Sequence, residues 1–110
     1  MKPEFVRAVA SKLPSVEERV QRDHLAWGVN GRYFARLKGH DLLFALTSDQ
    51  QREFLERNPL FAPLPGEWGG RGWMVVSIDV IDTTMLQTVL EAAHAMVASP
   101  EPPGTPPKRA

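Results

Sequence analysis

The stretch that decides the fold is LAWGVNGRYFARL, residues 25–37. Two short runs of apolar and aromatic residues, 25–29 and 32–37, flank the pair Asn30-Gly31. Asn and Gly both tolerate a positive φ, which the two central residues of a type I′ turn must adopt, so the pair is typical of a two-residue hairpin loop. We therefore predict that residues 25–37 form a β-hairpin.

The length of this loop also predicts which side chains share a face of the hairpin. A two-residue loop places Trp27 opposite Phe34, and the period of two along each strand puts Arg32 and Arg36 on the face of that aromatic pair. Two interpretations follow: the rings are core with the arginines extending from its rim, or they form a platform for a ligand. The pattern favours core for the rings and leaves both interpretations open for the arginines. The opposite face then carries Ala26, Gly28, Tyr33, Ala35 and Leu37.

Helical periodicity marks three segments outside the hairpin. Apolar residues recur every three or four positions over residues 3–13, between one proline that suits a first turn and another that ends the helix. Ser48 and Gln51 resemble a capping box at the start of a short helix. A final helix begins at Asp82 or Thr84, and its apolar residues form an almost continuous stripe. We expect this stripe to pack against a sheet.

Four further segments have the composition of strands or of the loops that join them. Residues 42–47 and 73–78 are typical of buried strands. Residues 15–22 form either a short edge strand or a loop, and residues 60–64 form an edge strand that a proline interrupts. The glycine-rich stretch 65–72 leads into a strand rather than a helix, which favours a wide turn over a phosphate cradle. The predicted fold class is α+β, an antiparallel sheet with packed helices in the order α-β(3)-α-β(2)-α.

The length and composition of the chain favour one domain. A chain of 110 residues, 43% hydrophobic and 24% charged, can bury one core, and we assign residues 1–98 to it. From residue 99 onward five of twelve residues are proline and no large apolar side chain follows, which predicts a flexible tail at 99–110. The chain has no cysteine, no apolar leader and no run of about 20 apolar residues, so we expect a cytoplasmic protein without a membrane span.

The sequence contains no motif for catalysis. The three histidines, His24, His40 and His94, are far apart and lack the spacing of metal-ligand motifs. No serine stands in a G-x-S-x-G context, and there is neither a Walker loop nor a dinucleotide fingerprint. The carboxylates of residues 49–56 alternate with arginines at helical spacing, as on a solvated face. We therefore predict no enzymatic activity, no metal site and no cofactor.

A basic and aromatic pattern remains as the signal for function. Residues 25–39 contain three cations and several aromatic rings but no acid, and the glycine-rich loop adds one more cation and one more ring. Arginines that contact phosphates and rings that stack on bases are typical of nucleic-acid-binding surfaces. Because 13 Lys and Arg balance 13 Asp and Glu over the whole chain, such a surface would have to be a local patch. The candidate residues are Arg32, Arg36, Lys38, Trp68 and Arg71.

Four segments of the chain together resemble a known family. They are the opening helix that ends in Leu13-Pro14, the hairpin WGVNGRYFARL at 27–37, the helix at 48–57, and the stretch from Phe61-x-Pro63 through Trp68-Gly69-x-Arg71-Gly72-Trp73. In this order they resemble the MmcQ/YjbR family of small bacterial proteins over residues 3 to about 98. The resemblance implies a fold similar to that of type III secretion chaperones, α-β(3)-α-β(2)-α, which agrees with the order derived above.

The resemblance also implies a function. Members of the family are described as DNA-binding proteins that use a double-wing motif. Carried over to this chain, the wings are the hairpin tip at Asn30-Gly31 and the loop at 66–72, and the matching residues are the five candidates named above. We therefore expect a non-enzymatic protein, monomeric, that contacts the phosphates of double-stranded DNA. The alternative is a protein-interaction or small-ligand-binding module of chaperone-like fold without a nucleic-acid role.

Overall fold

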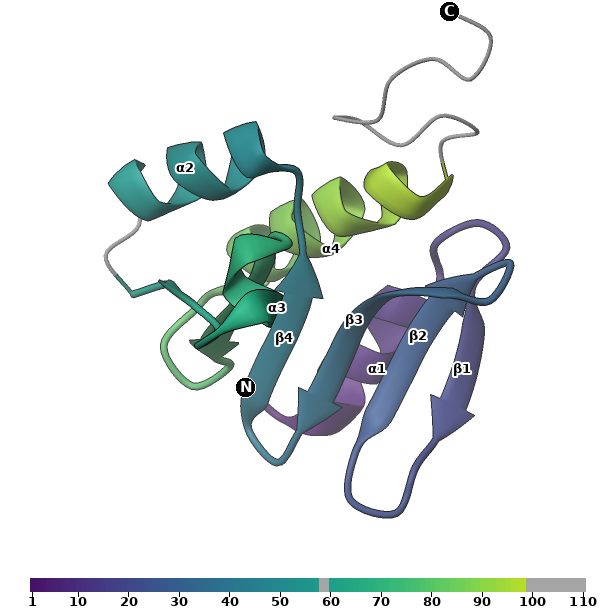
Figure 1. Cartoon of the computed structure of the whole chain (residues 1–110). Helices are drawn as coiled ribbons and strands as arrows, with labels where there is room; N and C mark the ends of the chain where they lie inside the picture. The colour runs from purple at the N-terminus through teal and green to yellow at the C-terminus, as the bar shows by residue number, and fades with distance from the viewer. Residues whose placement is uncertain (58–59, 99–110) are drawn as a thin grey trace, which may run out of the picture.

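A six-stranded antiparallel sheet forms the centre of the molecule (Figure 1). The structure is a computed structural model that describes residues 1–57 and 60–98, so the tail expected at 99–110 lies outside the described residues. The strand order across the sheet is β1-β2-β3-β4-β6-β5. In chain order the elements are α1 (Pro3–Ser11), β1 (Glu17–Val20), β2 (Leu25–Val29), β3 (Arg32–Lys38), β4 (Asp41–Ala45), α2 (Ser48–Arg57), β5 (Ala62–Pro63), α3 (Glu67–Gly70), β6 (Trp73–Ser77) and α4 (Thr83–Ala98).

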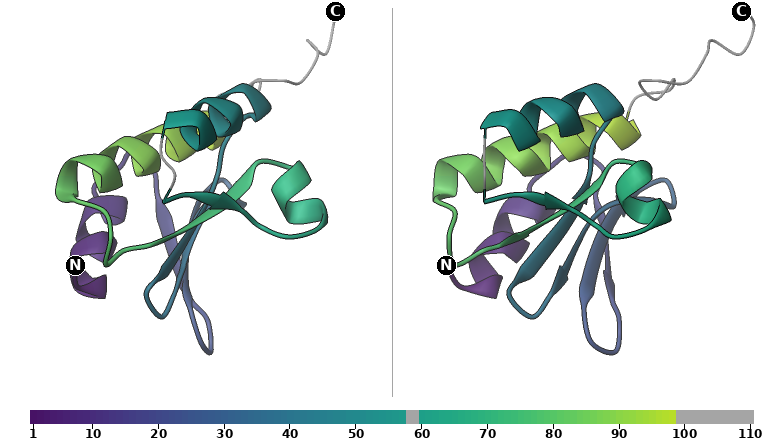
Figure 2. Two further views of the ribbon diagram at one scale, coloured as in Figure 1. Left: turned by 90° about the vertical axis from the view of Figure 1, so that its left-hand side faces the viewer. Right: turned by 60° about the vertical axis from the view of Figure 1, so that its left-hand side comes forward.

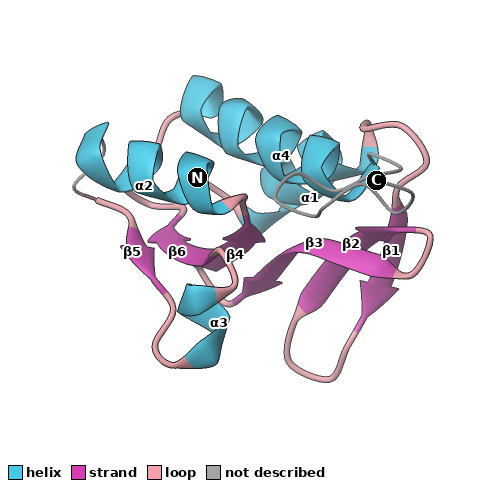
Figure 3. Cartoon of the chain, turned by 45° about the horizontal axis from the view of Figure 1, so that its top comes forward, coloured by secondary structure: helices cyan, strands magenta, loops and turns pink. Residues whose placement is uncertain are grey.

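Three helices cover one face of this sheet, and the short α3 lies on the other. α4 packs on β2, β3 and β4, and α1 packs beside α4. α2 places its partly buried Phe54 and Leu55 against the same core. α3 contacts β5 and β6 from the opposite side of the sheet, as the views in Figures 2 and 3 show. The predicted α+β class, with helices packed on an antiparallel sheet, is confirmed.

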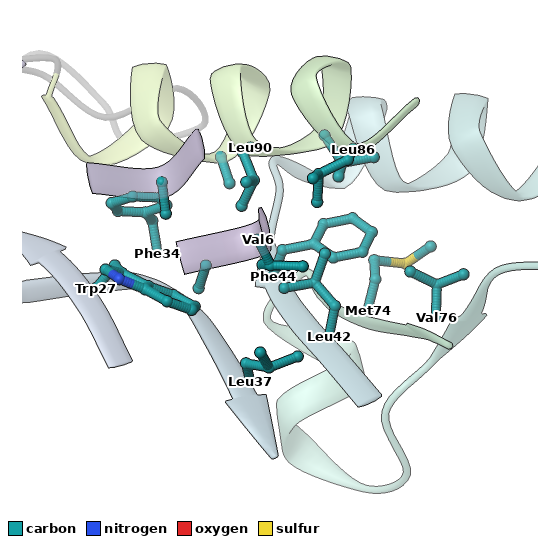
Figure 4. Packing of buried hydrophobic residues seen from close by; sticks show 14 of the residues in the cluster. Val6, Trp27, Phe34, Leu37, Leu42, Phe44, Met74, Val76, Leu86 and Leu90 are labelled. Atoms are coloured by element: carbon teal, nitrogen blue, oxygen red, sulfur yellow. The ribbon is translucent and has the colours of Figure 1, made fainter. Parts of the chain in front are cut away.

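The hydrophobic core lies between the sheet and the three covering helices (Figure 4). In β4, Leu42 and Phe44 are fully buried in this core, whereas Leu43 between them is partly exposed on the other face. The hairpin contributes Trp27 and Phe34, both without exposed surface. Each fully buried apolar side chain of this size stabilises the fold by about 1.5–3 kcal/mol. The interpretation of Trp27 and Phe34 as core residues is confirmed.

The turn of the hairpin has the predicted geometry. Asn30 has a φ of 52° and Gly31 a φ of 81°, so both central residues adopt the positive φ that a type I′ turn requires. β2 and β3 pair antiparallel on either side of the turn. The Asn-Gly pair therefore fixes the position of the hairpin in the chain.

The register of the hairpin differs from the prediction because the ladder contains a β-bulge. Trp27 pairs with Ala35 and not with Phe34, and the register shifts at the next residue of β2. Phe34 and Ala35 are consecutive and both fully buried, so the alternation of β3 shifts by one residue. Arg36 therefore lies on the face opposite Trp27, and the expectation that the two share a face is wrong.

The capping box of α2 lies one residue earlier than predicted. The side-chain oxygen of Thr47 accepts the N–H of Gln50 at 3.1 Å, and Gln50 Oε1 accepts the N–H of Thr47 at 3.1 Å. This reciprocal pair defines Thr47 as the N-cap in place of Ser48. Gln51 is thereby free to donate its side-chain N–H to the carbonyl of Gly69 in α3, at 2.8 Å. A side chain in the first turn of α2 thus helps to hold α3 on the far face of the sheet.

Three short segments of uncertain or irregular sequence contain regular elements. The stretch 15–22 includes β1, which pairs with β2 as an edge strand. The stretch 60–64, predicted as an edge strand that a proline interrupts, includes β5, which pairs with β6 at the opposite edge. The glycine-rich stretch 65–72, expected to be a wide turn, contains the single helical turn of α3. The structure therefore has one strand and one short helix more than the order α-β(3)-α-β(2)-α.

Candidate functional site

We call the sheet face opposite α1, α2 and α4 the open face. One row of paired residues crosses it from β1 through β2, β3 and β4 to β6: Arg19, Ala26, Arg36, Leu43 and Val75. This row therefore carries cations on β1 and β3 and apolar side chains on β4 and β6, and the exposed acids Glu17 and Asp41 lie on the same face, two residues along β1 and β4 from Arg19 and Leu43.

Arg36 is the central cation of the open face. Its guanidinium lies over the ring of Tyr33, 5.0 Å from the centroid. Its Nη1 lies 3.2 Å from Nε2 of His24, and Nδ1 of His24 lies 2.9 Å from Oδ1 of Asp23. Because an ionised carboxylate only accepts, Nδ1 donates to Asp23, and Nε2 of the neutral ring accepts from Arg36. Among the described residues no carboxylate lies within ion-pair distance of Arg36, so its charge is available to an external anion.

At the edge of this site Asp23 pairs with His24 and Lys38. The hydrogen bond from His24 holds the pKa of Asp23 below its ordinary value, and the charge of Lys38 acts in the same direction. Nζ of Lys38 lies 3.5 Å from Oδ2 of Asp23. The carboxylate thus partly neutralises Lys38 and leaves the charge of Arg36 without a direct counterion.

A second cluster of aromatic and cationic groups lies on and beside α3. Trp68 is 55% exposed, and its ring meets that of Trp73 edge to face, with the centroids 6.2 Å apart and the planes at 85°. The guanidinium of Arg71 lies over the Trp68 ring at 5.8 Å from the centroid. No described carboxylate pairs with Arg71 either. Arg71 therefore lies over an exposed ring, whereas Arg36 lies over the partly buried ring of Tyr33, and neither guanidinium has a described carboxylate partner.

Two glycines allow α3 to lie this close to the sheet. A Cβ on Gly69 would collide with the backbone carbonyl of Leu64, and a Cβ on Gly72 would collide with the backbone carbonyl of Leu46. Gly72 also has a φ of 98°, which side chains with a Cβ rarely adopt. These close approaches fix the position of Trp68 relative to β6.

The two clusters meet in a pocket of about 240 Å³. Its walls come from β3, β4, β6, α3 and the turn before α3, so residues far apart in the sequence form it together. They are mainly apolar, with one guanidinium among them. The pocket is lined by Arg36, Leu43, Leu64, Trp68 and Trp73.

Two of the five residues predicted to contact DNA lie away from this pocket. Arg32 extends toward the helical layer, where its Nη1 donates to the carbonyl of Val97 in the last turn of α4 at 3.4 Å. Lys38 lies at the far end of β3, beside Asp23. The three that the structure brings together on the open face are Arg36, Trp68 and Arg71.

Three aromatic or cationic residues of the open face were not identified as site residues from the sequence. Trp73 begins a strand in which Met74 and Val76 are buried, and this alternation is a signal that Trp73 faces the other way. Tyr33 was assigned to the face opposite Arg36, and the bulge brings the two together. Arg19 lies in the stretch that the sequence left open between strand and loop.

The other histidines and their partners have structural roles. His94 Nε2 donates to the carbonyl of Pro14 at 2.7 Å, and its ring packs edge to face on Phe34. His40 Nδ1 lies 2.9 Å from the carboxylate of Asp79. Within residues 1–57 and 60–98 there is no group of three His, Cys, Asp or Glu side chains that could hold a metal ion, and no helix long and apolar enough to cross a bilayer. The open face is therefore the strongest candidate site.

Comparison with known proteins gives matches in structure. No family model matches the chain, and no curated protein matches its sequence. The crystal structure of a Deinococcus radiodurans protein with a DUF419 domain superposes with a TM-score of 0.74 at 18% identity, covering 88% of this chain and 78% of that one. The crystal structure of a Pseudomonas syringae protein superposes with a TM-score of 0.70 at 11% identity, covering 88% of this chain and 99% of that one. These similarities show that the chain has the α+β fold of a DUF419 domain.

Proposed function

We propose that this chain is a non-enzymatic DNA-binding protein of the MmcQ/YjbR type that contacts phosphates from its open face. The observation that carries the proposal is the pairing of two guanidinium groups, those of Arg36 and Arg71, with aromatic rings and with no carboxylate within ion-pair distance among the described residues. The YjbR-like fold of the DUF419 domain supports the same assignment at the level of fold.

The distribution of charge supports a local binding surface. The chain as a whole is neutral, with 13 basic and 13 acidic side chains. Some of the acids pair with other arginines of the chain: Glu18 pairs with Arg7, and the exposed Asp49 pairs with Arg52 on α2. Within the described part of the chain Arg36 and Arg71 have no such pairing, and Arg36 shares a face with the exposed Arg19. A phosphate that reaches these groups gains charge-assisted hydrogen bonds without displacing a protein carboxylate.

The proposed contact surface differs from two separate wing tips. The hairpin tip directs Arg32 toward α4, whereas Arg36 in the middle of β3 faces the same side of the sheet as α3. The proposed surface therefore extends from Arg36 on β3 across the pocket to Trp68 on α3.

Fluorescence anisotropy of a labelled DNA oligonucleotide, measured at several salt concentrations, tests the proposal. The logarithm of the binding constant should fall linearly with the logarithm of the salt concentration, because phosphate neutralisation releases counterions. The double variant Arg36→Ala/Arg71→Ala should bind more weakly and should reduce the magnitude of this slope by about 2.

A matched control removes the same charge elsewhere. Arg52→Ala/Arg57→Ala also deletes two exposed arginines, but these lie on α2 and pair with acids of the same helix. This variant should bind DNA with nearly the affinity of the wild type. The absence of binding at low salt, or equal losses in the two double variants, would contradict the proposal.

One observation favours a second candidate function, a small-ligand-binding module without a nucleic-acid role. The pocket on the open face combines apolar walls with one guanidinium, which suits a small planar anion as well as part of a nucleic acid. Titration with mononucleotides distinguishes the two functions. A free nucleotide that binds as tightly as an oligonucleotide would favour the second.

A further inference from the structure

The pocket on the open face has the size and chemistry of a site for one flat ring. Pockets for drug-sized ligands measure about 300–1,000 Å³, and this pocket, at about 240 Å³, is smaller. Its walls include two indoles, from Trp68 and Trp73, and two leucines. A single aromatic ring system therefore fits this space better than a longer ligand does.

The geometry of the two indoles leaves a ring face for stacking. Trp68 and Trp73 stand nearly perpendicular, at 85°. In such a pair one ring presents its edge to the other, so the two indoles do not stack and one of them keeps both faces clear of its partner. The guanidinium of Arg71 lies over one side of the Trp68 ring and leaves the other side clear of that cation. Trp68 is also more than half exposed to solvent. Aromatic side chains with accessible faces are the groups on which single-stranded nucleic acids stack their bases.

One cation lines this pocket, and a second lies over the ring of one of its tryptophans. Arg36 lines it from β3, and Arg71 follows α3, which contributes Trp68. Arg19 lies in the same row as Arg36 two strands away, about 10 Å across the sheet. A nucleic-acid backbone that passes over the pocket would meet a guanidinium on either side of the inserted base.

The shape of the site favours an unpaired base over a base pair. In a duplex the bases are stacked on one another, so a flat ring enters a pocket only after it has been unpaired and unstacked, which costs a few kcal/mol. A single strand does not incur the unpairing cost. We propose that the pocket of Arg36, Leu43, Leu64, Trp68 and Trp73 receives one unpaired base of single-stranded DNA, while Arg36 and Arg71 contact the flanking phosphates. This inference rests on the proposed function and names its ligand more narrowly.

Anisotropy titrations with matched oligonucleotides test the inference. The probes are a single strand, the duplex of the same sequence, and the single strand with its bases removed at internal abasic sites. The intact strand should bind at least about tenfold more tightly than the abasic strand, because stacking of a base on an aromatic side chain is lost. It should also bind more tightly than the duplex.

Variants of Trp68 link this difference to the pocket. Trp68→Leu keeps an apolar side chain but removes the ring, and it should lower the affinity for the intact strand by about tenfold while leaving the affinity for the abasic strand unchanged. Trp68→Phe should restore most of the affinity because it restores an aromatic face. Near-ultraviolet circular dichroism confirms that each variant is folded.

The outcomes separate this inference from the proposed function. Salt-dependent binding of equal strength to the intact strand, the abasic strand and the duplex would overturn the base pocket and leave the phosphate-binding surface in place. If a mononucleotide binds as tightly as the strand, the ligand of the pocket is a free nucleotide, and the proposal that it binds a single strand is overturned. No binding to any probe at low salt would overturn both proposals.

Discussion

The two faces of the sheet use the same residue types in opposite ways. On the covered face Trp27 is fully buried, its Nε1 donates to Glu18 at 3.0 Å, and Arg7 binds the same carboxylate with Nη2 at 2.7 Å from Oε2. On the open face Trp68 is more than half exposed, and Arg71 lies over its ring without a described carboxylate partner. On the covered face the ring and the cation bond to a carboxylate of the same chain and so stabilise the fold. On the open face the ring and the cation have no such described partner and are available to bind an external ligand.

The largest expected effect compares these two tryptophans. Trp27→Ala should lower the free energy of unfolding by about 3–5 kcal/mol, because it leaves a cavity in the core and removes the donor to Glu18. Trp68→Ala should lower it by about 1 kcal/mol, the value of one aromatic contact. Urea denaturation measures both. Similar losses of unfolding free energy in the two variants would contradict the distinction between a structural and a binding tryptophan.

A second comparison concerns the glycines that hold α3. Gly72→Ala should cost about 2 kcal/mol or more, because its positive φ of 98° disfavours a Cβ and the Cβ would collide with the carbonyl of Leu46. Gly70→Ala is the matched control, since a Cβ there meets no atom within 4 Å. We expect the control to have wild-type stability or slightly more in chemical denaturation. A stable Gly72→Ala variant would show that α3 is not fixed by this contact.

The smallest expected effect on stability concerns the ion pair on the covered face. The hydrogen bond from Arg7, and to a lesser extent that from Trp27, holds the pKa of Glu18 below its ordinary value. Because the pKa is lowered on folding, this pair stabilises the fold above the ordinary pKa of a glutamate, and the contribution is lost as the pH falls through the lowered pKa. Glu18→Gln should therefore cost about 1 kcal/mol at pH 7 and almost nothing at pH values below both pKa values.

Urea midpoints at several pH values measure this difference, with Glu17→Gln as the control. Glu17 is the exposed neighbour of Glu18 in β1, and its side chain makes no described ion pair. A loss in Glu18→Gln that does not change with pH would contradict the assignment of charge to this contact.

Features that depend on local chemistry were predictable from the sequence. The Asn30-Gly31 pair fixed the hairpin turn, since few residues adopt two successive positive φ values. The apolar stripe of the last helix predicted α4 and its packing on the sheet. In both cases residues close together in the sequence determine the local conformation.

Features that depend on contacts between distant segments were not predictable from the sequence. The bulge arises where Phe34 and Ala35 are both buried, and Phe34 meets the ring of His94 on α4. Without that contact in view, strict alternation assigns Arg36 to the wrong face. Thr47 and Ser48 have nearly the same capping pattern, and the structure uses Thr47 while Gln51 bonds to α3.

The pocket itself could not be predicted, because its five lining residues come from separate segments of the chain. Arg36, Trp68 and Arg71 were identified from their types alone. Their position near Trp73 depends on the pairing of β4 with β6 in the sheet and on the close approach of α3 to the sheet.

The most direct test of the account uses the indole N–H signals of the three tryptophans in a ¹H–¹⁵N spectrum. Substitution of each tryptophan by phenylalanine assigns its signal. During titration with a single-stranded oligonucleotide at low salt, the signals of Trp68 and Trp73 on the open face should shift, and the signal of the buried Trp27 should stay in place. Shifts confined to Trp27, or no shift in any of the three signals, would contradict the claim that the open face is the binding surface.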